Sequence, residues 1–213
     1  MWSDVEDVFG KNKYLTAAIP IEFVRDMRDD RLNPTKGYRF MINAKPTYET
    51  YRGTFFSSFE GAITGYQSLG ADDRFVLAGK LAGGTIIGGN ELSDIPATRR
   101  FFLGGGGTVR GYGYQEISPR NGEDKLLGGR SYMAASAEVR IGITETIGIV
   151  PFIDVGTVST DEVPDFKDIR AGAGVGLRYA TPFGPLRLDV AVPLDKYPGG
   201  TSFGVYAGIG QSF

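Results

Sequence analysis

The 213-residue sequence contains no cysteine and no histidine. Without cysteine there are no disulfide bonds and no thiolate metal sites. Without histidine there is no Ser-His-Asp triad and no histidine-ligated zinc. Carboxylate chemistry remains possible, but most hydrolase templates are excluded, and we expect a protein that is not an enzyme and that carries no cofactor or metal. The net charge of −2 gives no electrostatic reason to expect a nucleic-acid partner.

Long hydrophobic runs are missing too. We find no apolar stretch of about 18 residues, the length that a membrane-spanning helix needs. The first ten residues, MWSDVEDVFG, are acidic where a secretory signal peptide is basic and then apolar. We therefore expect no export signal in this chain.

The dominant pattern is an alternation of apolar residues with polar or small ones. It is clearest in residues 169–180, where one face carries Ile169, Ala171, Ala173, Val175, Leu177 and Tyr179, and the other carries Arg170, Gly172, Gly174, Gly176, Arg178 and Ala180. A period of two predicts β-strands with one apolar face. The pattern predicts nine strands and no helix, at 14–24, 37–49, 53–66, 73–85, 131–141, 147–156, 169–180, 184–193 and 202–213.

The length of these strands distinguishes two kinds of β protein. A soluble sandwich also alternates, but its strands usually run about 5–6 residues. Strands of about 9–11 residues with an apolar face and a polar, glycine-rich face are typical of membrane-spanning barrels. The last segment favours the same class, since Phe203, Val205, Ile209 and the final Phe213 share one face. We therefore predict an all-β fold, an antiparallel transmembrane β-barrel.

Connections between the predicted strands alternate between short turns and longer loops. The long loops are 86–130, 157–168 and 194–201, and long loops of outer-membrane barrels lie outside the cell. This parity places the end of the last strand in the periplasm. Nine strands is an odd number, whereas single-chain bacterial barrels have even numbers, so we expect the chain to be part of a larger barrel.

Several motifs together resemble the surface-antigen superfamily that includes BamA and TamA. They are TVRGY (108–112), FIDVG (152–156), the stretch from 172 to 195, the final GIGQSF, and DMRDDRLNPTKGYRF (26–40). The likeness spans the whole chain, 1–213, and its ending is more similar to TamA than to BamA. It implies a sixteen-stranded outer-membrane barrel preceded by POTRA domains, of which this chain would supply the last nine strands, without POTRA domains or signal peptide.

The resemblance also implies a function. Members insert β-barrels into the outer membrane of Gram-negative bacteria or pass polypeptides across it, without covalent chemistry. The implied partners are outer-membrane lipid, client outer-membrane or autotransporter polypeptides, and an inner-membrane-anchored or periplasmic assembly partner. An exposed edge of the last strand, at 202–213, would template an incoming strand. A two-partner secretion transporter and a passive pore or structural barrel remain as alternatives.

The resemblance further implies that Arg110 folds back into the barrel lumen and pairs with Glu138 and Asp154. The alternation independently places both carboxylates on the lumen face. A guanidinium fork can engage two carboxylates at once. The rest of the candidate site comprises Thr108, Val109, Gly111 and Tyr112 of the loop motif, Phe152 and Gly156 of the wall motif, and a glycine hinge at Gly104, Gly105, Gly106 and Gly107.

Within this loop we expect Tyr112 and Tyr114 to pack inside the lumen. The alternative is that 86–130 is a disordered external loop with Arg110 in solvent.

Other constellations support weaker hypotheses. Asp26, Asp29 and Asp30 suggest a calcium loop but lack the EF-hand spacing, so a solvated turn is the simpler interpretation. GAGVG (172–176) resembles a dinucleotide fingerprint, yet it lies inside a strand with no helix after it. The remaining charged residues of the last strands predict a polar network in the lumen, with substrate contact as the alternative: Arg170, Arg178, Arg187 and Asp189.

Overall fold

The computed structural model describes residues 2–70 and 72–213, which form one eleven-stranded antiparallel sheet. The strands are β1 (Trp2–Asp7), β2 (Gly10–Ala18), β3 (Ile21–Asp26), β4 (Gly37–Glu49), β5 (Thr54–Leu69), β6 (Phe75–Gly88), β7 (Ser131–Gly142), β8 (Ile147–Ser159), β9 (Arg170–Tyr179), β10 (Leu186–Pro193) and β11 (Gly204–Ile209). Two short 3-10 helices, η1 (Leu92–Asp94) and η2 (Ala97–Arg99), follow β6. Among the described residues, no helix has the length and apolar character needed to cross a membrane.

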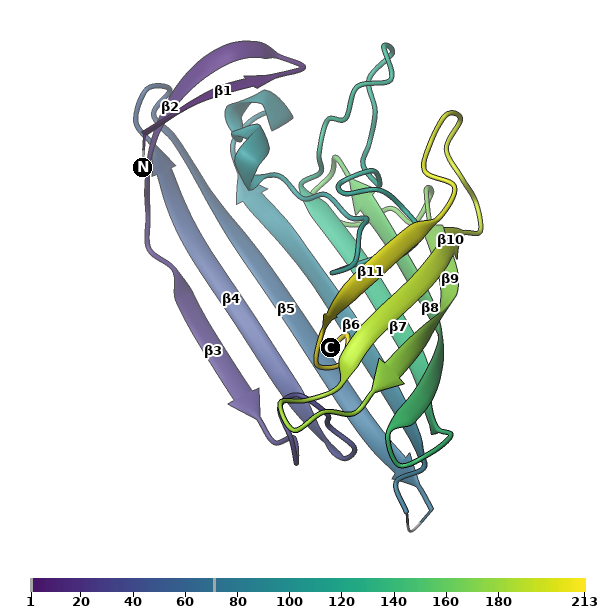
Figure 1. Ribbon diagram of the computed structural model, residues 1–213. Coiled ribbons are helices and arrows are strands. Elements are labelled where there is room, and N and C mark those ends of the chain that lie inside the picture. Colours follow the sequence, from purple (N-terminus) through teal and green to yellow (C-terminus); the bar gives the residue numbers. More distant parts are fainter. Residues whose placement is uncertain (1, 71) are drawn as a thin grey trace.

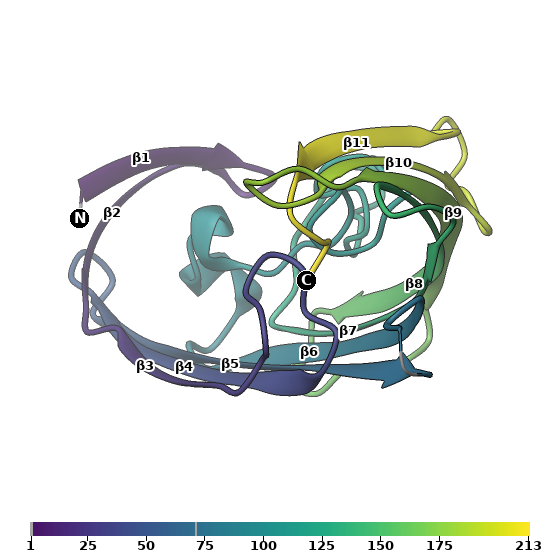
Figure 2. The same cartoon turned by 60° about the horizontal axis from the view of Figure 1, so that its bottom comes forward.

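The sheet curls into an incomplete cylinder. From β4 to β11 each strand pairs with the next one along the chain, while β3 pairs only with β4. Within the described residues no pairing joins β11 to β1 or β3, so the wall is open on one side (Figure 2). The predicted antiparallel barrel wall is therefore confirmed, and it is not closed.

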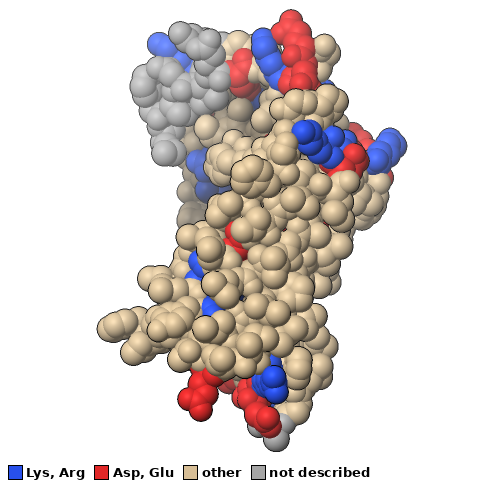
Figure 3. All heavy atoms as spheres, turned by 45° about the vertical axis from the view of Figure 1, so that its right-hand side comes forward, with Lys and Arg blue, Asp and Glu red and all other residues tan. Residues whose placement is uncertain are grey.

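The alternation in sequence sets which side chains face inward. On β10, Leu188 and Val190 point outward and are exposed, whereas Arg187, Asp189 and Ala191 point to the interior. Figure 3 shows the result on the outer surface, where charged residues gather at the two ends and a mostly uncharged band lies between them. Such a band is the surface that a lipid bilayer requires.

The prediction for the first strand differs from the structure. Residues 14–24 were expected as one strand, but Pro20 has no N–H to donate and separates β2 from β3. Both pieces pair with β4 in one continuous register, from Ala18 opposite Thr47 to Ile21 opposite Ala44. They are one wall strand, which accounts for the nine predicted. The remaining strand, β1, was not predicted from the sequence. It forms a hairpin with the first half of β2.

The prediction for the chain end is also corrected. The last strand stops at Ile209, because Gly210 adopts a positive φ of 86° and turns the chain inward. Phe203, Val205 and Ile209 are exposed on the outer face as expected. Phe213 is not with them: its ring centroid lies 6.4 Å from that of Tyr66, an inward-facing residue of β5.

Loops and turns separate to opposite ends of the cylinder. The long loops 89–130, 160–169 and 194–203 lie with the β1–β2 hairpin at the top of Figure 1, and the short turns lie at the bottom. The loop between β6 and β7 descends into the cylinder, and the end of the chain lies at the interior near the short turns (Figures 1 and 2).

Candidate functional site

The β6–β7 loop is an ordered, packed segment inside the lumen. Isolated bridges pair Phe101 with Gly129 and Leu103 with Ile117, which folds the loop into narrow arms. A buried apolar cluster then joins the loop to the wall and to the β10–β11 loop: Leu103, Val109, Tyr112, Ile117, Val158 and Tyr197. The loop is therefore held by its own hydrophobic contacts, in contrast to the alternative of a disordered external segment.

At the tip of the loop, Arg110 is clasped by acidic side chains of the wall. Its Nε and Nη2 atoms donate to the two carboxylate oxygens of Asp154 on β8 at 2.7 and 3.0 Å. Its Nη1 atom donates to Glu138 on β7 at 2.9 Å. The backbone amide of Arg110 adds a bond to Asp154 at 3.1 Å. The structure thus brings together the arginine and both carboxylates named from the sequence.

A third carboxylate completes this site. Asp189 on β10 accepts a hydrogen bond from Arg110 Nη1 at 3.0 Å and is fully buried. The sequence placed Asp189 on the lumen face but not next to Arg110. The alternation does not show that Asp189 lies opposite Gly176 on β9, where the absence of a side chain leaves space beside the carboxylate. That register was needed to predict the contact with Arg110.

Burial makes these contacts strong. Arg110 is 2% exposed, and its guanidinium carbon lies 3.4 Å from the ring centroid of Phe152. Burial alone would lower the pKa of Arg110, but hydrogen bonding to Asp154 and the charges of Glu138 and Asp189 outweigh it and raise the pKa. The arginine is therefore a permanent cation, and removing it would leave the buried carboxylate of Asp154 without its ion-pair partner.

Glycines allow the loop backbone to approach the wall. A Cβ atom at Gly172 on β9 would overlap the carbonyl oxygen of Arg110, and one at Gly156 on β8 would lie 2.7 Å from Leu103. Of the predicted hinge, Gly104 and Gly105 adopt positive φ angles of 108° and 92°, whereas Gly106 and Gly107 do not. The sharp turn thus resides in the first two glycines.

The other residues of the loop motif fix its position. Thr108 accepts a hydrogen bond from the amide of Gly104 at 2.8 Å, and Val109 is fully buried. The hydroxyl of Tyr112 donates to the carbonyl of Asp195 at 2.6 Å, which ties the loop to the β10–β11 loop. Tyr114, expected inside the lumen, is 83% exposed and points to solvent.

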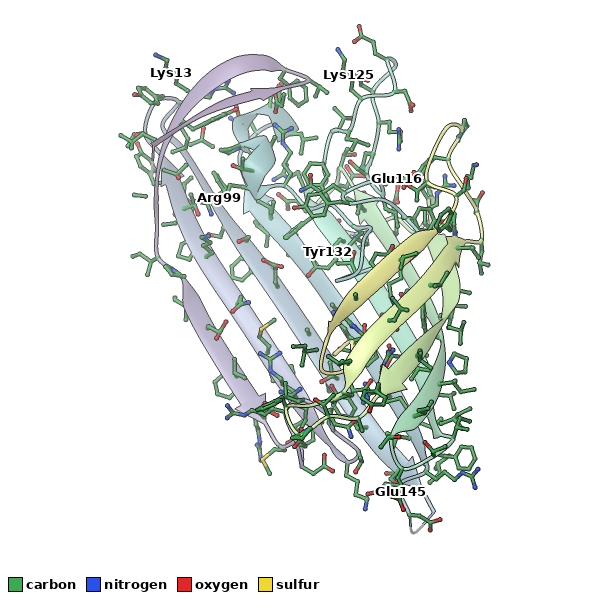
Figure 4. The ribbon with its side chains drawn as sticks, viewed as in Figure 1. Lys13, Arg99, Glu116, Lys125, Tyr132 and Glu145 are labelled. Carbon is green, nitrogen blue, oxygen red and sulfur yellow. The ribbon has the colours of Figure 1, made fainter. Side chains whose placement is uncertain are left out.

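Two residues that the sequence reasoning did not single out also anchor the loop. Tyr206 on β11 accepts a hydrogen bond from the amide of Gly111 at 3.0 Å, so the last strand contacts the loop motif directly. Glu116, labelled in Figure 4, joins the β6–β7 loop to the β10–β11 loop, because it accepts hydrogen bonds from the amides of Gly113 and Thr201. Burial alone would raise the pKa of Glu116, but these amide hydrogen bonds lower it.

The acidic turn before β4 is occupied by its own contacts. Asp26 forms an ion pair with Arg28 at 2.7 Å. Asp29 accepts hydrogen bonds from Thr35 and the amide of Lys36, and Asp30 accepts from the amides of neighbouring residues. In the described part of the chain, no cluster of three acidic residues is placed to hold a metal ion. Residues 172–176 lie within β9, as a strand.

Fold and site together define a membrane-type β-barrel wall with an arginine-bearing loop held in its lumen. The Omp85 superfamily domain matches residues 3–213, and the chain belongs to that superfamily. This confirms the family that the sequence motifs resembled.

Among relatives, the outer membrane protein assembly factor BamA of Nitratidesulfovibrio vulgaris is 27% identical over 205 residues, which cover 85% of this chain and 23% of that protein. The BamA of Neisseria meningitidis is 25% identical over 209 residues, covering 82% of this chain and 26% of that protein. This chain therefore spans about a quarter of the length of these relatives. The crystal structure of BamA from Haemophilus ducreyi lacking POTRA domains 1–3 has the same fold, with a TM-score of 0.76 and 22% identity over 92% of this chain and 43% of that chain.

Proposed function

We propose that this chain is the wall of an outer-membrane barrel that assembles other membrane proteins. It would lie in the outer membrane of a Gram-negative bacterium, with the end of β11 toward the periplasm, and it would act without covalent chemistry. Its relatives named as BamA are outer membrane protein assembly factors, which supports the proposal. The TamA-like subtype and an inner-membrane-anchored or periplasmic assembly partner stay predictions.

The observation that carries this proposal is the free edge of β11. Within the described residues β11 pairs only with β10, so the N–H and C=O groups of its other edge have no strand partner. A sheet edge of this kind can template an incoming strand by β-augmentation. Tyr206 on this strand contacts the lumen loop, so the clasp at Arg110 would hold the edge in place.

A reconstituted assembly reaction tests the proposal. The chain is placed in liposomes, an unfolded client barrel is added, and the folded fraction is followed by its heat-dependent gel mobility. We expect faster client folding than in empty liposomes, and at least a fivefold smaller gain with Asp154→Ala, because Arg110 loses its bidentate partner. Asp124→Ala, which removes an exposed carboxylate next to Lys125 at the outer end of the same loop, serves as the control and should retain the gain.

The alternatives give different results in the same liposomes. Ion conductance across a planar bilayer without any gain in client folding would contradict assembly and favour a passive pore. Passage of a client polypeptide into the liposome interior, without insertion, would favour a two-partner secretion transporter.

A further inference from the structure

A second cluster of charge lies in the lumen, at the end where the short turns gather. A cavity of about 520 Å³ opens there, and Arg140, Arg178, Asn33, Thr35 and Gln211 are among the residues that line it. Cavities of roughly 300–1,000 Å³ hold ligands of the size of a drug molecule or a short peptide, so this volume exceeds the needs of one small ion.

Two arginines face each other beside this cavity. Arg178 on β9 and Arg187 on β10 are directly opposite in the strand register, and both side chains point inward. Like charges directly opposite on neighbouring strands destabilise a sheet. Both guanidinium groups rely on the same carboxylate: Asp189 lies 2.5 Å from Arg178 and 3.8 Å from Arg187, and it also binds Arg110.

Several donors of this arginine pair are left without an acceptor. Arg178 is only 5% exposed, and its Nη2 atom has no hydrogen-bond partner in the described part of the chain. The buried Nε and Nη1 atoms of Arg187 lack partners there as well. A buried donor without a partner costs about 1–3 kcal/mol, and more when it is charged. Arg140, by contrast, donates to the carbonyl oxygens of Pro34 and Phe213, so its guanidinium is satisfied by the chain itself.

We propose that the Arg178–Arg187 pair is a binding site for the carboxylate of a polypeptide segment that enters the lumen from the short-turn end. One carboxylate between two guanidinium groups would relieve their repulsion and accept the unpartnered N–H donors. A lipid headgroup is disfavoured as the source, because the pair faces the lumen and the apolar surface that lipid covers lies on the opposite face of the same strands. Other polar side chains of this cavity are already engaged: Gln211 accepts from Arg178 and donates to Asn33, and Thr35 donates to Asp29. Recognition of the segment therefore falls to the unpartnered donors of the arginine pair.

This site goes beyond the proposed assembly function and is tested by binding alone. The chain in detergent is titrated into a dye-labelled, C-terminally amidated Gly-Glu-Gly peptide or its amidated Gly-Gln-Gly analogue, which differ only in the side-chain carboxylate, and fluorescence anisotropy reports the affinity. We expect the glutamate peptide to bind at least tenfold more tightly than the glutamine peptide. Arg187→Gln should abolish this preference, and Arg187→Lys should restore part of it. Arg187→Gln should fold, because Asp189 keeps its closer partners Arg110 and Arg178.

Arg74→Gln is the matched control, since it removes one positive charge from the exposed rim of the same cavity. It should leave the tenfold preference intact. Equal affinity for the two peptides, or an equal loss with Arg74→Gln and Arg187→Gln, would overturn the proposal. Tight binding of inorganic phosphate or of phosphatidylglycerol vesicles, with no preference between the peptides, would overturn the polypeptide assignment.

Discussion

The hydroxyl of Tyr206 on the last strand bridges two consecutive residues of the lumen loop. It accepts a hydrogen bond from the amide of Gly111 at 3.0 Å and donates to the carbonyl of Tyr112 at 3.2 Å. The loop tip is therefore fastened on one side by the carboxylates that bind Arg110 and on the other by β11. Any movement of β11 would therefore disturb the loop, and any movement of the loop would disturb β11.

Replacement of Tyr206 by phenylalanine should loosen the loop motif without breaking the wall. The change leaves the amide of Gly111 without its acceptor, which costs about 1–3 kcal/mol for a buried donor. We expect faster hydrogen exchange at residues 108–113, measured by mass spectrometry. Tyr179→Phe, at an exposed outward position on β9, is the control. Unchanged protection of the loop in Tyr206→Phe would show that this hydroxyl does not hold it.

Removal of the arginine should have a larger effect. Arg110→Ala leaves the buried carboxylate of Asp154 without its ion-pair partner. Glu138 still pairs with Arg140, and Asp189 still pairs with Arg178. Truncating one partner of a buried ion pair costs about 3–5 kcal/mol. We expect proteases to cut residues 100–115 far more rapidly than in the unaltered chain. Arg110→Lys should rescue only partly, because an ammonium group cannot reproduce the bidentate contact with Asp154.

Lys125→Ala is the control for this experiment, because Lys125 is an exposed residue at the outer tip of the same loop (Figure 4). It should leave the cleavage rate unchanged. Equal cleavage of 100–115 in Arg110→Ala and in the unaltered chain would mean that the clasp does not order the loop.

The barrel wall was predictable because each strand's inward and outward faces are set by the alternation of residues along that strand alone. A strand between lipid and lumen must alternate apolar and polar residues, and β9 and β10 show that alternation without interruption. The first hairpin was not predictable on this basis: KNK in β2 and DVED in β1 have no continuous apolar face. The inward turn at Gly210 was hidden for another reason, because the alternation of the sequence continues past the residue where the strand ends.

The candidate site was predictable only in part. Alternation shows which side chains face the lumen, but it does not show which of them meet across several strands or at what depth. Glu138 and Asp154 were identified because the family resemblance pairs them with the loop arginine and the alternation places both on the lumen face, whereas Asp189 depended on strand register and on the depth that the loop reaches. Contacts between loops, such as that of Glu116 with Thr201, leave no periodic signal at all.

The close approach of the loop to β9 predicts a steric effect. Gly172→Ala would place a methyl group on the carbonyl oxygen of Arg110, and neither backbone can move without disturbing Asp154 or β10. We expect a loss of about 1–3 kcal/mol in the free energy of unfolding, as for other overpacked interiors, measured by urea titration. Gly65→Ala on β5 is the control, since a Cβ atom there meets no atom within 4 Å. Equal stability of the two variants would contradict the packing at Gly172.

Acidification should release the contact that Glu116 makes between the β6–β7 loop and the β10–β11 loop. The pKa of Glu116 is lowered from its usual 4.5 by the amides of Gly113 and Thr201, which act against the effect of burial. A depressed pKa in the folded state means that the stabilisation is fully present above pH 4.5 and is lost as the pH falls through the lower folded-state value. Hydrogen-exchange protection of Gly113 and Thr201, corrected for intrinsic rates, should therefore decrease in that window. Glu116→Gln should show weak protection at every pH, whereas Glu145→Gln, at the opposite end of the barrel in Figure 4, should behave like the unaltered chain. Equal protection of both amides in the unaltered chain and in Glu116→Gln at neutral pH would show that the charge of Glu116 does not fasten the loops.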